Sequence, residues 1–372
     1  MHFFAGVMIP FFTIWGGITF AQVMILQSFF VFSKFALEIP TGTIADRFGR
    51  KTSIILSVII TALAVVLYAT YPSFYIFLAA EFLWALGFAL LSGADEALVY
   101  DSLKKIKQEK ESKKIFAKLG SFELIGIMVA SPIGSIIAQH IGLRYSMIFM
   151  VLPFTAAVIV ASTLKEPRFK RRRETDYWNM MFEGVKYFKK HRILKILAFD
   201  RLSIFILSFM IIWLYQPVLQ NLNIHIIYFG FVNSLMLVGE VLVINNFVKL
   251  ERLSGSKKRY LLLSALISGI AFIILGLTDI PAIVVALFIV IASFGLVRDV
   301  LFKSYMNKYI ESKNRATVIS TVAMLGSFAI GILYPIIGYL VEWSLQYTLI
   351  IIGLMIIICA IFSKVKEEHL LD

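Results

Sequence analysis

Residues 42–51 have the sequence GTIADRFGRK, and they separate two long apolar stretches at 18–41 and 52–71. Apolar stretches of 18 or more residues recur along the rest of the chain, and each is long enough to cross a bilayer as a helix. Of the 372 residues, 59% are hydrophobic and 16% are charged. Soluble domains are usually about 45–50% apolar and about 25% charged, so the composition excludes a soluble enzyme and a disordered protein. We therefore predict an all-α, polytopic membrane protein.

Twelve spans can be placed along the chain. Each must be a helix, because the bilayer core offers no water to backbone N–H and C=O groups. The first span has only fifteen residues, whereas a span needs about 20, so we expect its helix to be truncated. The predicted spans are 1–15, 18–41, 52–71, 74–98, 119–139, 143–163, 196–217, 225–248, 260–278, 281–302, 315–340 and 345–363.

Lys and Arg residues gather on one side of this topology. Of the 36 in the chain, 33 fall in the even-numbered loops and the C-terminal tail, and only Arg144 falls in an odd-numbered loop. The remaining two, Lys34 and Arg201, lie inside spans. Because basic loops stay inside, this bias predicts a cytoplasmic C-terminus in a multi-pass protein of the cell membrane. The net charge of +13 then reflects topology and contact with anionic headgroups, so nucleic acid is not needed as a partner.

The two halves of the chain look like copies. Asp46-Arg47-Phe48 and Glu251-Arg252-Leu253 are 205 residues apart, and Pro132 and Pro335 are 203 apart. Matches in order at nearly one offset predict two six-helix pseudo-repeats, which is a transporter architecture with its site at the midplane. The predicted parts are an N-terminal half at 1–163, a cytoplasmic linker at 164–195, a C-terminal half at 196–363 and a cytoplasmic tail at 364–372.

The linker contains a basic run, KRRR at 170–173, followed by apolar residues at helical spacing. This pattern predicts an amphipathic helix on the cytoplasmic headgroups, and a flexible linker is the alternative. The apolar residues are Trp178, Met181, Phe182, Val185 and Phe188.

The loop at 42–51 resembles the signature loop of the major facilitator superfamily, G-x-L-A-D-R-x-G-R-K, with Ile44 in place of leucine. It also lies between spans 2 and 3, as in that family. With the twelve spans and the duplication, the resemblance covers the whole chain. It implies a secondary transporter that works by alternating access, in which this loop is a cytoplasmic latch. The latch residues implied here are Gly42, Asp46, Arg47, Gly49, Arg50, Lys51 and Asp101.

Elementary geometry gives the same loop a physical interpretation. Its two glycines permit a tight turn and a close helix approach. Asp46 is predicted near the start of span 3, where the helix dipole favours a carboxylate, and Arg50 follows within reach of an i,i+4 pair. Asp101 closes span 4 on the same side of the membrane and is a second possible partner for Arg50. A loop that only fixes topology is the alternative to a latch.

Glu81 is the clearest ionisable candidate inside a predicted span, where charges are costly and often functional. Glu81, Trp84, Phe88 and Asp95 recur at spacings that predict one helix face. We predict that Glu81 titrates a proton or contacts a cation beside an aromatic wall of Trp84 and Phe88. The resemblance implies that span 4 lines the central cavity. The alternative is a Glu held by a neighbouring helix for packing.

Weaker candidates come from the second half. Trp213 and Gln216 in span 7 are further cavity candidates. Asp200-Arg201 and Arg298-Asp299 lie near the inner ends of spans 7 and 10, where they could form a cytoplasmic gate. A snorkelling structural role is the alternative for these charges.

The direction of transport is indicated by residues 126–135. They resemble, in degraded form, the antiporter motif of drug exporters, G-x-x-x-G-P-x-x-G-G, and close packing of small residues is the alternative. We predict ion-coupled efflux of a small or drug-like solute, with the proton as coupling ion. The alternatives are an uptake symporter and a non-transporting membrane sensor or scaffold.

Features of enzymes and cofactor sites are missing from the sequence. It has no P-loop and no G-x-G-x-x-G, its five histidines show no ligand spacing, and its single cysteine is Cys359. We therefore expect no enzymatic activity, no cofactor, no metal and a monomeric protein.

Overall fold

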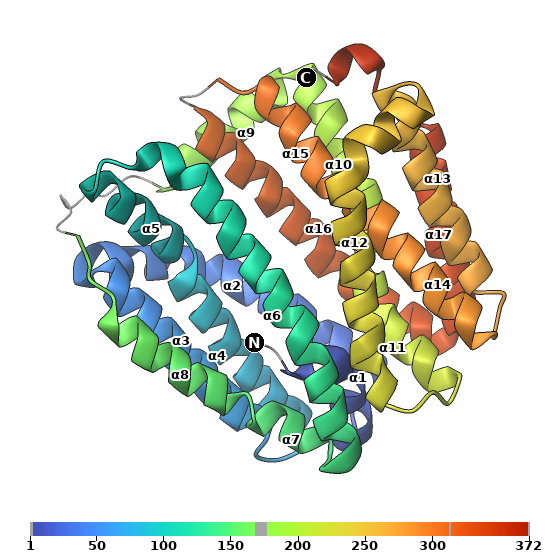
Figure 1. Cartoon of the computed structure of the whole chain (residues 1–372), viewed down its shortest axis with the longest axis horizontal. Coiled ribbons are helices and arrows are strands. Elements are labelled where there is room, and N and C mark those ends of the chain that lie inside the picture. The colour runs from blue at the N-terminus through green and yellow to red at the C-terminus, as the bar shows by residue number, and fades with distance from the viewer. Residues whose placement is uncertain (1–2, 168–176, 312–313, 371–372) are drawn as a thin grey trace. The chain divides into compact units, whose positions relative to one another are not determined.

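The computed structural model describes residues 3–167, 177–311 and 314–370. Every regular element in these ranges is a helix (Figure 1), which confirms the predicted all-α class. Contacts divide the chain into two units. Unit 1 consists of Met1–Thr175 and His225–Phe231, and unit 2 consists of Asp176–Ile224 and Val232–Asp372.

The membrane spans agree with the predicted number. Within the described residues, ten helical segments are long and apolar enough to cross a membrane. Two shorter apolar segments, Phe3–Trp15 and Leu345–Ile361, lie where the first and last spans are predicted. The first segment changes its helix type along its length, through the 3-10 helix η1 (Phe3–Val7), α1 (Met8–Pro10) and the π-helix η2 (Phe11–Trp15).

In unit 1, α4 packs against both α2 and α3, and α8 packs against α3 (Figure 1). The first long helix starts at a capping box, in which Thr19 and Gln22 satisfy each other's backbone N–H groups. The remaining helices of unit 1 are α2 (Phe20–Phe48), α3 (Arg50–Tyr68), α4 (Phe74–Leu91), α5 (Ala94–Lys105), η3 (Glu109–Glu111), α6 (Ser112–His140), α7 (Leu143–Ile148) and α8 (Val151–Thr163).

Helix α4 ends at Leu91, in the middle of the span predicted at 74–98. Its last carbonyl groups have no partner within their own helix, and hydroxyl groups of neighbouring helices satisfy two of them. Thr41 Oγ1 on α2 donates to Ala89 O at 3.1 Å, and Ser53 Oγ on α3 donates to Leu90 O at 2.6 Å. The chain then turns at Gly93, whose φ is +74°, and continues as α5.

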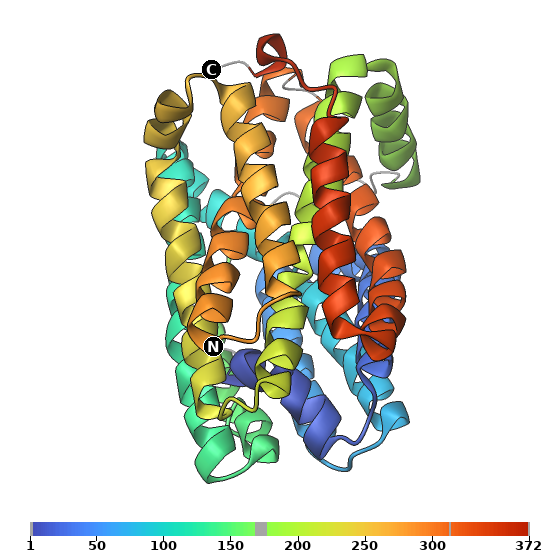
Figure 2. The same cartoon turned by 90° about the vertical axis from the view of Figure 1, so that its right-hand side faces the viewer.

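Unit 2 contains the helices that follow the linker. Helices α13 and α17 pack side by side, as do α10 and α15 (Figures 1 and 2). The elements are α9 (Tyr177–Lys190), α10 (Arg192–Phe209), α11 (Ile211–Asn221), α12 (Ile227–Ser254, whose first residues group with unit 1), α13 (Lys257–Leu275), α14 (Pro281–Ile291), the π-helix η4 (Ala292–Leu296), α15 (Arg298–Lys308), α16 (Arg315–Trp343), α17 (Leu345–Ile361) and η6 (Glu367–His369).

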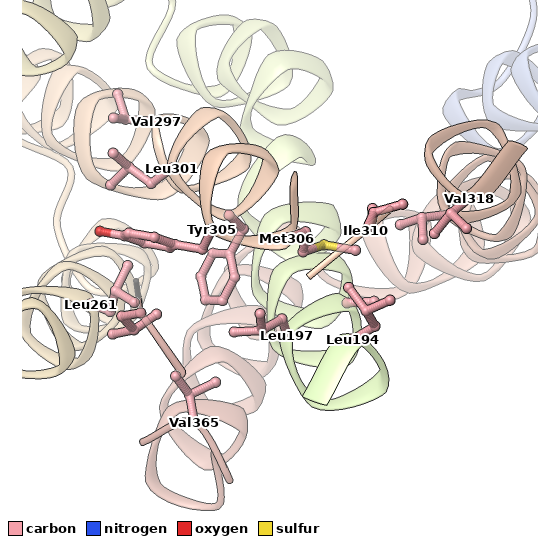
Figure 3. Packing of buried hydrophobic residues seen from close by; sticks show 14 of the residues in the cluster. Leu194, Leu197, Leu261, Val297, Leu301, Tyr305, Met306, Ile310, Val318 and Val365 are labelled. Carbon is pink, nitrogen blue, oxygen red and sulfur yellow. The ribbon is translucent and has the colours of Figure 1, made fainter. Parts of the chain in front are cut away.

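A buried apolar cluster joins α10, α13, α15 and α16 to residues 363–370, which we call the C-terminal segment. Figure 3 shows Leu197, Leu261 and Val365 in this cluster, each contributed by a different part of unit 2. Val365 is 4% exposed, and Leu370 at the end of the segment is also buried. The C-terminal segment is therefore part of the packed structure of unit 2.

Helix α9 lies within the predicted linker. Gly184 of α9 approaches α16 so closely that an added Cβ would lie 2.8 Å from Thr317 Cγ2, and Phe188 packs against the apolar cluster. The described part of α9 therefore packs on protein. The basic run at 170–173 and the side chains of 177–183 lie outside the described residues, so contact of this helix with headgroups remains a prediction.

Candidate functional site

Glu81 is enclosed by three helices of unit 1. It lies on α4 and its side chain is buried at 3% exposure. Gln27 on α2 donates from Nε2 to Glu81 Oε1 at 2.8 Å, and the hydroxyl group of Tyr68 on α3 also hydrogen-bonds to the carboxylate. A buried carboxylate is tolerated when polar partners compensate its lost hydration. This arrangement satisfies that condition, and it can serve either a titrating group or a packing role.

Aromatic rings form one wall beside this carboxylate. Trp84 stacks on Phe88 with ring centroids 6.0 Å apart, and Tyr68 meets Trp84 edge-on at the same distance. Phe154 of α8 meets Trp84 edge-on at 6.3 Å. Trp84 and Phe88 therefore lie in one group of rings with Tyr68, which also contacts the carboxylate, and the role of these rings as a cavity wall stays a prediction.

Asp95 does not share the helix face of Glu81, contrary to the prediction from its spacing. The face ends with α4 at Leu91, and the turn at Gly93 starts a new helix. Asp95 is exposed in the first turn of α5, where its Oδ1 accepts the N–H of Glu96 at 2.8 Å. The periodicity argument failed because a helix break resets the direction in which side chains point.

The signature loop forms a second cluster in unit 1, centred on Arg50. Arg50 makes an ion pair with Asp101 of α5, and its Nη1 also donates to Ala97 O at 2.7 Å. Lys51 Nζ donates to Ser162 O at the end of α8, at 2.6 Å. The loop thus connects the start of α3 to α5 and to the end of α8. Of the two predicted partners of Arg50, Asp101 is the one that the structure places at the ion pair.

Asp46 has a different position from the predicted one. It is exposed in the last turn of α2, whereas it was expected to complement the dipole at the start of the next helix. The carboxylate at the start of α3 is instead that of Glu166, which follows α8. Its carboxylate accepts the backbone N–H of Arg50 at 2.7 Å and of Lys51 at 3.2 Å. Arg47, which is also exposed, lies over the Phe48 ring at 5.6 Å.

The same acidic cap recurs in unit 2, 201 residues later in the chain. Glu367, in the C-terminal segment, accepts the backbone N–H groups of Lys257 and Lys258 at 3.0 Å and 2.8 Å. These are the first residues of α13, as Arg50 and Lys51 are of α3. Although the second copy of the loop lost much of its sequence pattern, this capping interaction was retained.

Removal of the Glu166 cap should destabilise unit 1. We expect Glu166→Ala to lower the free energy of unfolding by about 0.5–2 kcal/mol, as for other N-cap losses, and Asp46→Ala to change it by less than about 0.5 kcal/mol, as for an exposed site. Denaturation of both variants in detergent micelles measures the difference. Equal losses would contradict the assignment of the cap to Glu166.

Asp200, Arg201, Arg298 and Asp299 form two reciprocal ion pairs between α10 and α15, which we call the charge quartet. Arg298 Nη2 donates to Asp200 Oδ1 at 2.7 Å, and Arg201 Nη2 lies 2.7 Å from Asp299 Oδ1. The first pair is almost completely buried, at 2% and 6% side-chain exposure. Arg298 also donates to Ser264 Oγ at 2.9 Å and to Leu261 O. The sequence-predicted gate residues are therefore brought together within unit 2.

The remaining predicted cavity residues, Trp213 and Gln216 of α11, have hydrogen-bond partners on α16 and on α11 itself. Trp213 Nε1 donates to the hydroxyl group of Tyr334 at 3.1 Å, and Gln216 Nε2 donates to the Tyr215 hydroxyl group at 2.9 Å. Both Trp213 and Gln216 are buried in unit 2. In the part of the chain that the structure describes, no group of three or more His, Cys, Asp or Glu side chains could hold a metal ion.

Of the two glycines in residues 126–135, Gly134 has a packing role, whereas a Cβ at Gly126 would meet no atom within 4 Å. Gly134 of α6 lies directly against the backbone of Phe3 in η1, where a Cβ would collide with the carbonyl group. This contact supports the alternative of small-residue packing.

Comparison with known families decides the identity of the fold. The family model described as Major Facilitator Superfamily matches residues 1–248 and 202–370. The chain belongs to the Major Facilitator Superfamily. As a member of this transporter family it is a multi-pass membrane transporter, and it is not an enzyme.

Individual relatives in the superfamily are distant. The uncharacterized MFS-type transporter YxaM of Bacillus subtilis (strain 168) is 22% identical over 367 residues, which cover 94% of this chain and 90% of the relative. Among solved structures, the D323A mutant of the nucleoside transporter NupG gives a TM-score of 0.79 at 13% identity, covering 97% of this chain and 94% of that one. A D-xylose-proton symporter gives 0.68 at 16% identity, covering 94% and 88%. At such identities, these similarities establish the fold.

The partners that hold the predicted residues in place were not predicted from the sequence. Gln27 and Tyr68 are ordinary residues of apolar helices, and no spacing rule relates them to Glu81. For Glu166 and Glu367 a signal existed, because each is an acidic residue that follows the last span of its half at nearly the repeat offset.

Proposed function

We propose that the protein is a proton-coupled transporter that moves a small polar solute across the cell membrane, with Glu81 as the coupling carboxylate. The observation that supports this role is the burial of Glu81 against Gln27, Tyr68 and Trp84. A carboxylate that three helices hold in an apolar setting can exchange its charge for a proton as those helices move.

Uptake is the direction that we favour. The structural neighbours named above are a nucleoside transporter and a D-xylose-proton symporter, which suggests a polar solute with hydroxyl groups. Aromatic residues beside a hydrogen-bonding carboxylate suit such a solute, because rings stack on its flat faces while polar groups orient it. Efflux of drug-like molecules is the second candidate, and its basis is the sequence resemblance of residues 126–135 to the antiporter motif, whose Gly134 also has a packing role.

The test uses proteoliposomes with a preset proton gradient. Labelled nucleosides, pentoses and lipophilic cations are added in turn, and solute accumulation and lumenal pH are followed together. We expect one solute class to accumulate only with the gradient, and Glu81→Gln to reduce accumulation to the level seen without a gradient. Glu123→Gln is the matched control, because Glu123 is an exposed carboxylate of α6. Gradient-driven transport that persists in Glu81→Gln would exclude Glu81 from coupling.

The signature loop is proposed as a latch on the cytoplasmic side, where the basic loops and the C-terminus would lie. Its support is the ion pair of Arg50 with Asp101, which connects α3 to α5 and can open without unfolding either helix. The charge quartet is proposed to have the same role in unit 2, where it connects α10 to α15. We also propose that each six-helix half moves as a body, and that the protein works as a monomer.

The latch leads to a kinetic prediction. We expect Arg50→Ala and Asp101→Asn to lower the turnover rate while solute binding changes little, because the ion pair selects between conformations and does not touch the solute. Lys105→Ala should leave turnover unchanged, since Lys105 is an exposed residue of α5 outside the loop. Exchange and binding assays on the same proteoliposomes separate the two effects. Normal turnover in both latch variants would disprove the latch.

A further inference from the structure

Unit 2 has a cavity at the end where α10 and α13 begin and α17 has ended. Its volume is about 530 Å³, within the range of small-molecule sites. The first turn of α10, the start of α13 and the C-terminal segment contribute its walls. The cavity is therefore assembled by the fold from three separate parts of the chain.

Positive charge dominates the lining of this cavity. The lining includes four basic residues and one carboxylate, that of Glu368, so its net charge is +3 with His369 neutral. Lys366 Nζ lies 3.3 Å from Glu368 Oε1, so one of the four has a protein counterion. The basic residues are Arg192, Lys258, Lys364 and Lys366. All four basic residues are exposed to solvent, which screens their mutual repulsion, and together they give the cavity a positive potential that attracts anions.

These charges are presented by an ordered backbone. Ser363 donates to Asp200 of the charge quartet, and Glu367 accepts two N–H groups of α13. Lys257 Nζ donates to Leu370 O at 3.0 Å, and Val365 is buried in the apolar cluster. An anion would thus meet preformed walls, and little conformational entropy would be lost on binding.

Neutral hydrogen-bond donors are available at the same cavity. His369 is buried and lines it. Because His369 Nδ1 accepts the N–H of Lys366 at 3.2 Å, the ring proton of the neutral form is on Nε2, which can donate. Arg192, another lining residue, is the first residue of α10, and the N-cap residue His191 makes no side-chain capping bond there. The start of a helix adds a favourable dipole for an anion.

The apolar lining of the cavity and its depth in the membrane indicate which anion it binds. Ile193 and Ile196 of α10 line the cavity next to the basic residues. The segments Arg192–Asn221 and Lys257–Leu275 are membrane spans, so their first residues lie at the depth of lipid headgroups. Basic pockets at this depth, with apolar surface beside them, suit an anionic phospholipid. We propose that this cavity binds the phosphate of an anionic phospholipid headgroup and thereby secures the C-terminal segment.

The experiment titrates the purified full chain with phosphatidylglycerol or phosphatidylcholine and measures bound lipid by native mass spectrometry. The variant Lys258→Gln/Lys364→Gln removes two charges of the cavity, and the N–H of Lys258 that Glu367 accepts is kept. Arg192→Gln removes the charge that the first residue of α10 contributes. The control Lys104→Gln/Lys105→Gln makes the same charge change at exposed residues of α5. Size-exclusion profiles verify folding of each variant.

We expect phosphatidylglycerol to bind in preference to phosphatidylcholine, and the affinity to fall at least about tenfold in the double cavity variant and not in the control. If glycerol 3-phosphate at equal concentration displaces the lipid, the cavity is still a phosphate site, but its ligand is a soluble phosphate and not a lipid headgroup. Equal binding of both lipids, or equal losses in the cavity and control variants, would overturn the proposal. None of these outcomes depends on the transported solute or on the coupling ion.

Discussion

Asp200→Ala should destabilise unit 2 by about 3–5 kcal/mol, the usual cost of removing one partner from a buried ion pair. The substitution leaves the Arg298 guanidinium group buried at 2% exposure without its carboxylate. It also removes the acceptor of Ser363, through which the C-terminal segment is attached to α10. The loss should therefore exceed that of a typical surface substitution several-fold.

The second half of this prediction concerns the double variant Asp200→Asn/Arg298→Met. It removes both charges and keeps the approximate volumes, so its loss should be much smaller than that of Asp200→Ala, because paired buried charges contribute little net stability over apolar replacements. Lys303→Ala is the control, since Lys303 pairs with Asp299 at 2.6 Å but is 52% exposed, and such pairs contribute about 0–1 kcal/mol. Unfolding in mixed micelles measures all three. A double variant as unstable as Asp200→Ala would show that hydrogen bonding, and not charge, holds this site.

The sequence was sufficient for the fold class and the number of spans because the bilayer imposes one rule on every segment. Apolar length and the placement of Lys and Arg therefore carry most of the topology. The exact ends of helices follow weaker local signals. α2 extends to Phe48, through seven of the ten residues of the loop predicted at 42–51, because no residue before Gly49 requires a positive φ.

The candidate sites were predictable as single residues and much less as networks. The four residues of the charge quartet were found because charges inside spans are rare, and their reciprocal pairing depends on α10 and α15 packing together. Glu81 was found for the same reason, but its partners Gln27 and Tyr68 are 54 and 13 residues away in the chain. Local spacing cannot report contacts of that kind, because they are set by how separate helices pack.

The two glycines of the signature loop show that residues with equal weight in a motif can have different structural roles. The motif gives Gly42 and Gly49 similar importance. In the structure Gly49 alone forms the turn, with φ +100° and ψ 153°, a region of backbone conformation that is essentially restricted to glycine. A Cβ at this position would also lie 2.7 Å from Glu166 Oε2, the carboxylate that caps α3. Gly42 lies inside α2, and a Cβ there would meet no atom within 4 Å.

Gly49→Ala should therefore destabilise the protein by about 1–3 kcal/mol from backbone strain alone, and by more if Glu166 is displaced from its two N–H groups. Gly42→Ala should stabilise it by about 0.5–1 kcal/mol, because alanine is the better helix former at an unobstructed position. The two substitutions are chemically identical and seven residues apart, so opposite signs can only come from local conformation. Thermal unfolding of both variants in the same detergent gives the comparison, and losses of similar size would mean that the loop has a different conformation from the one described.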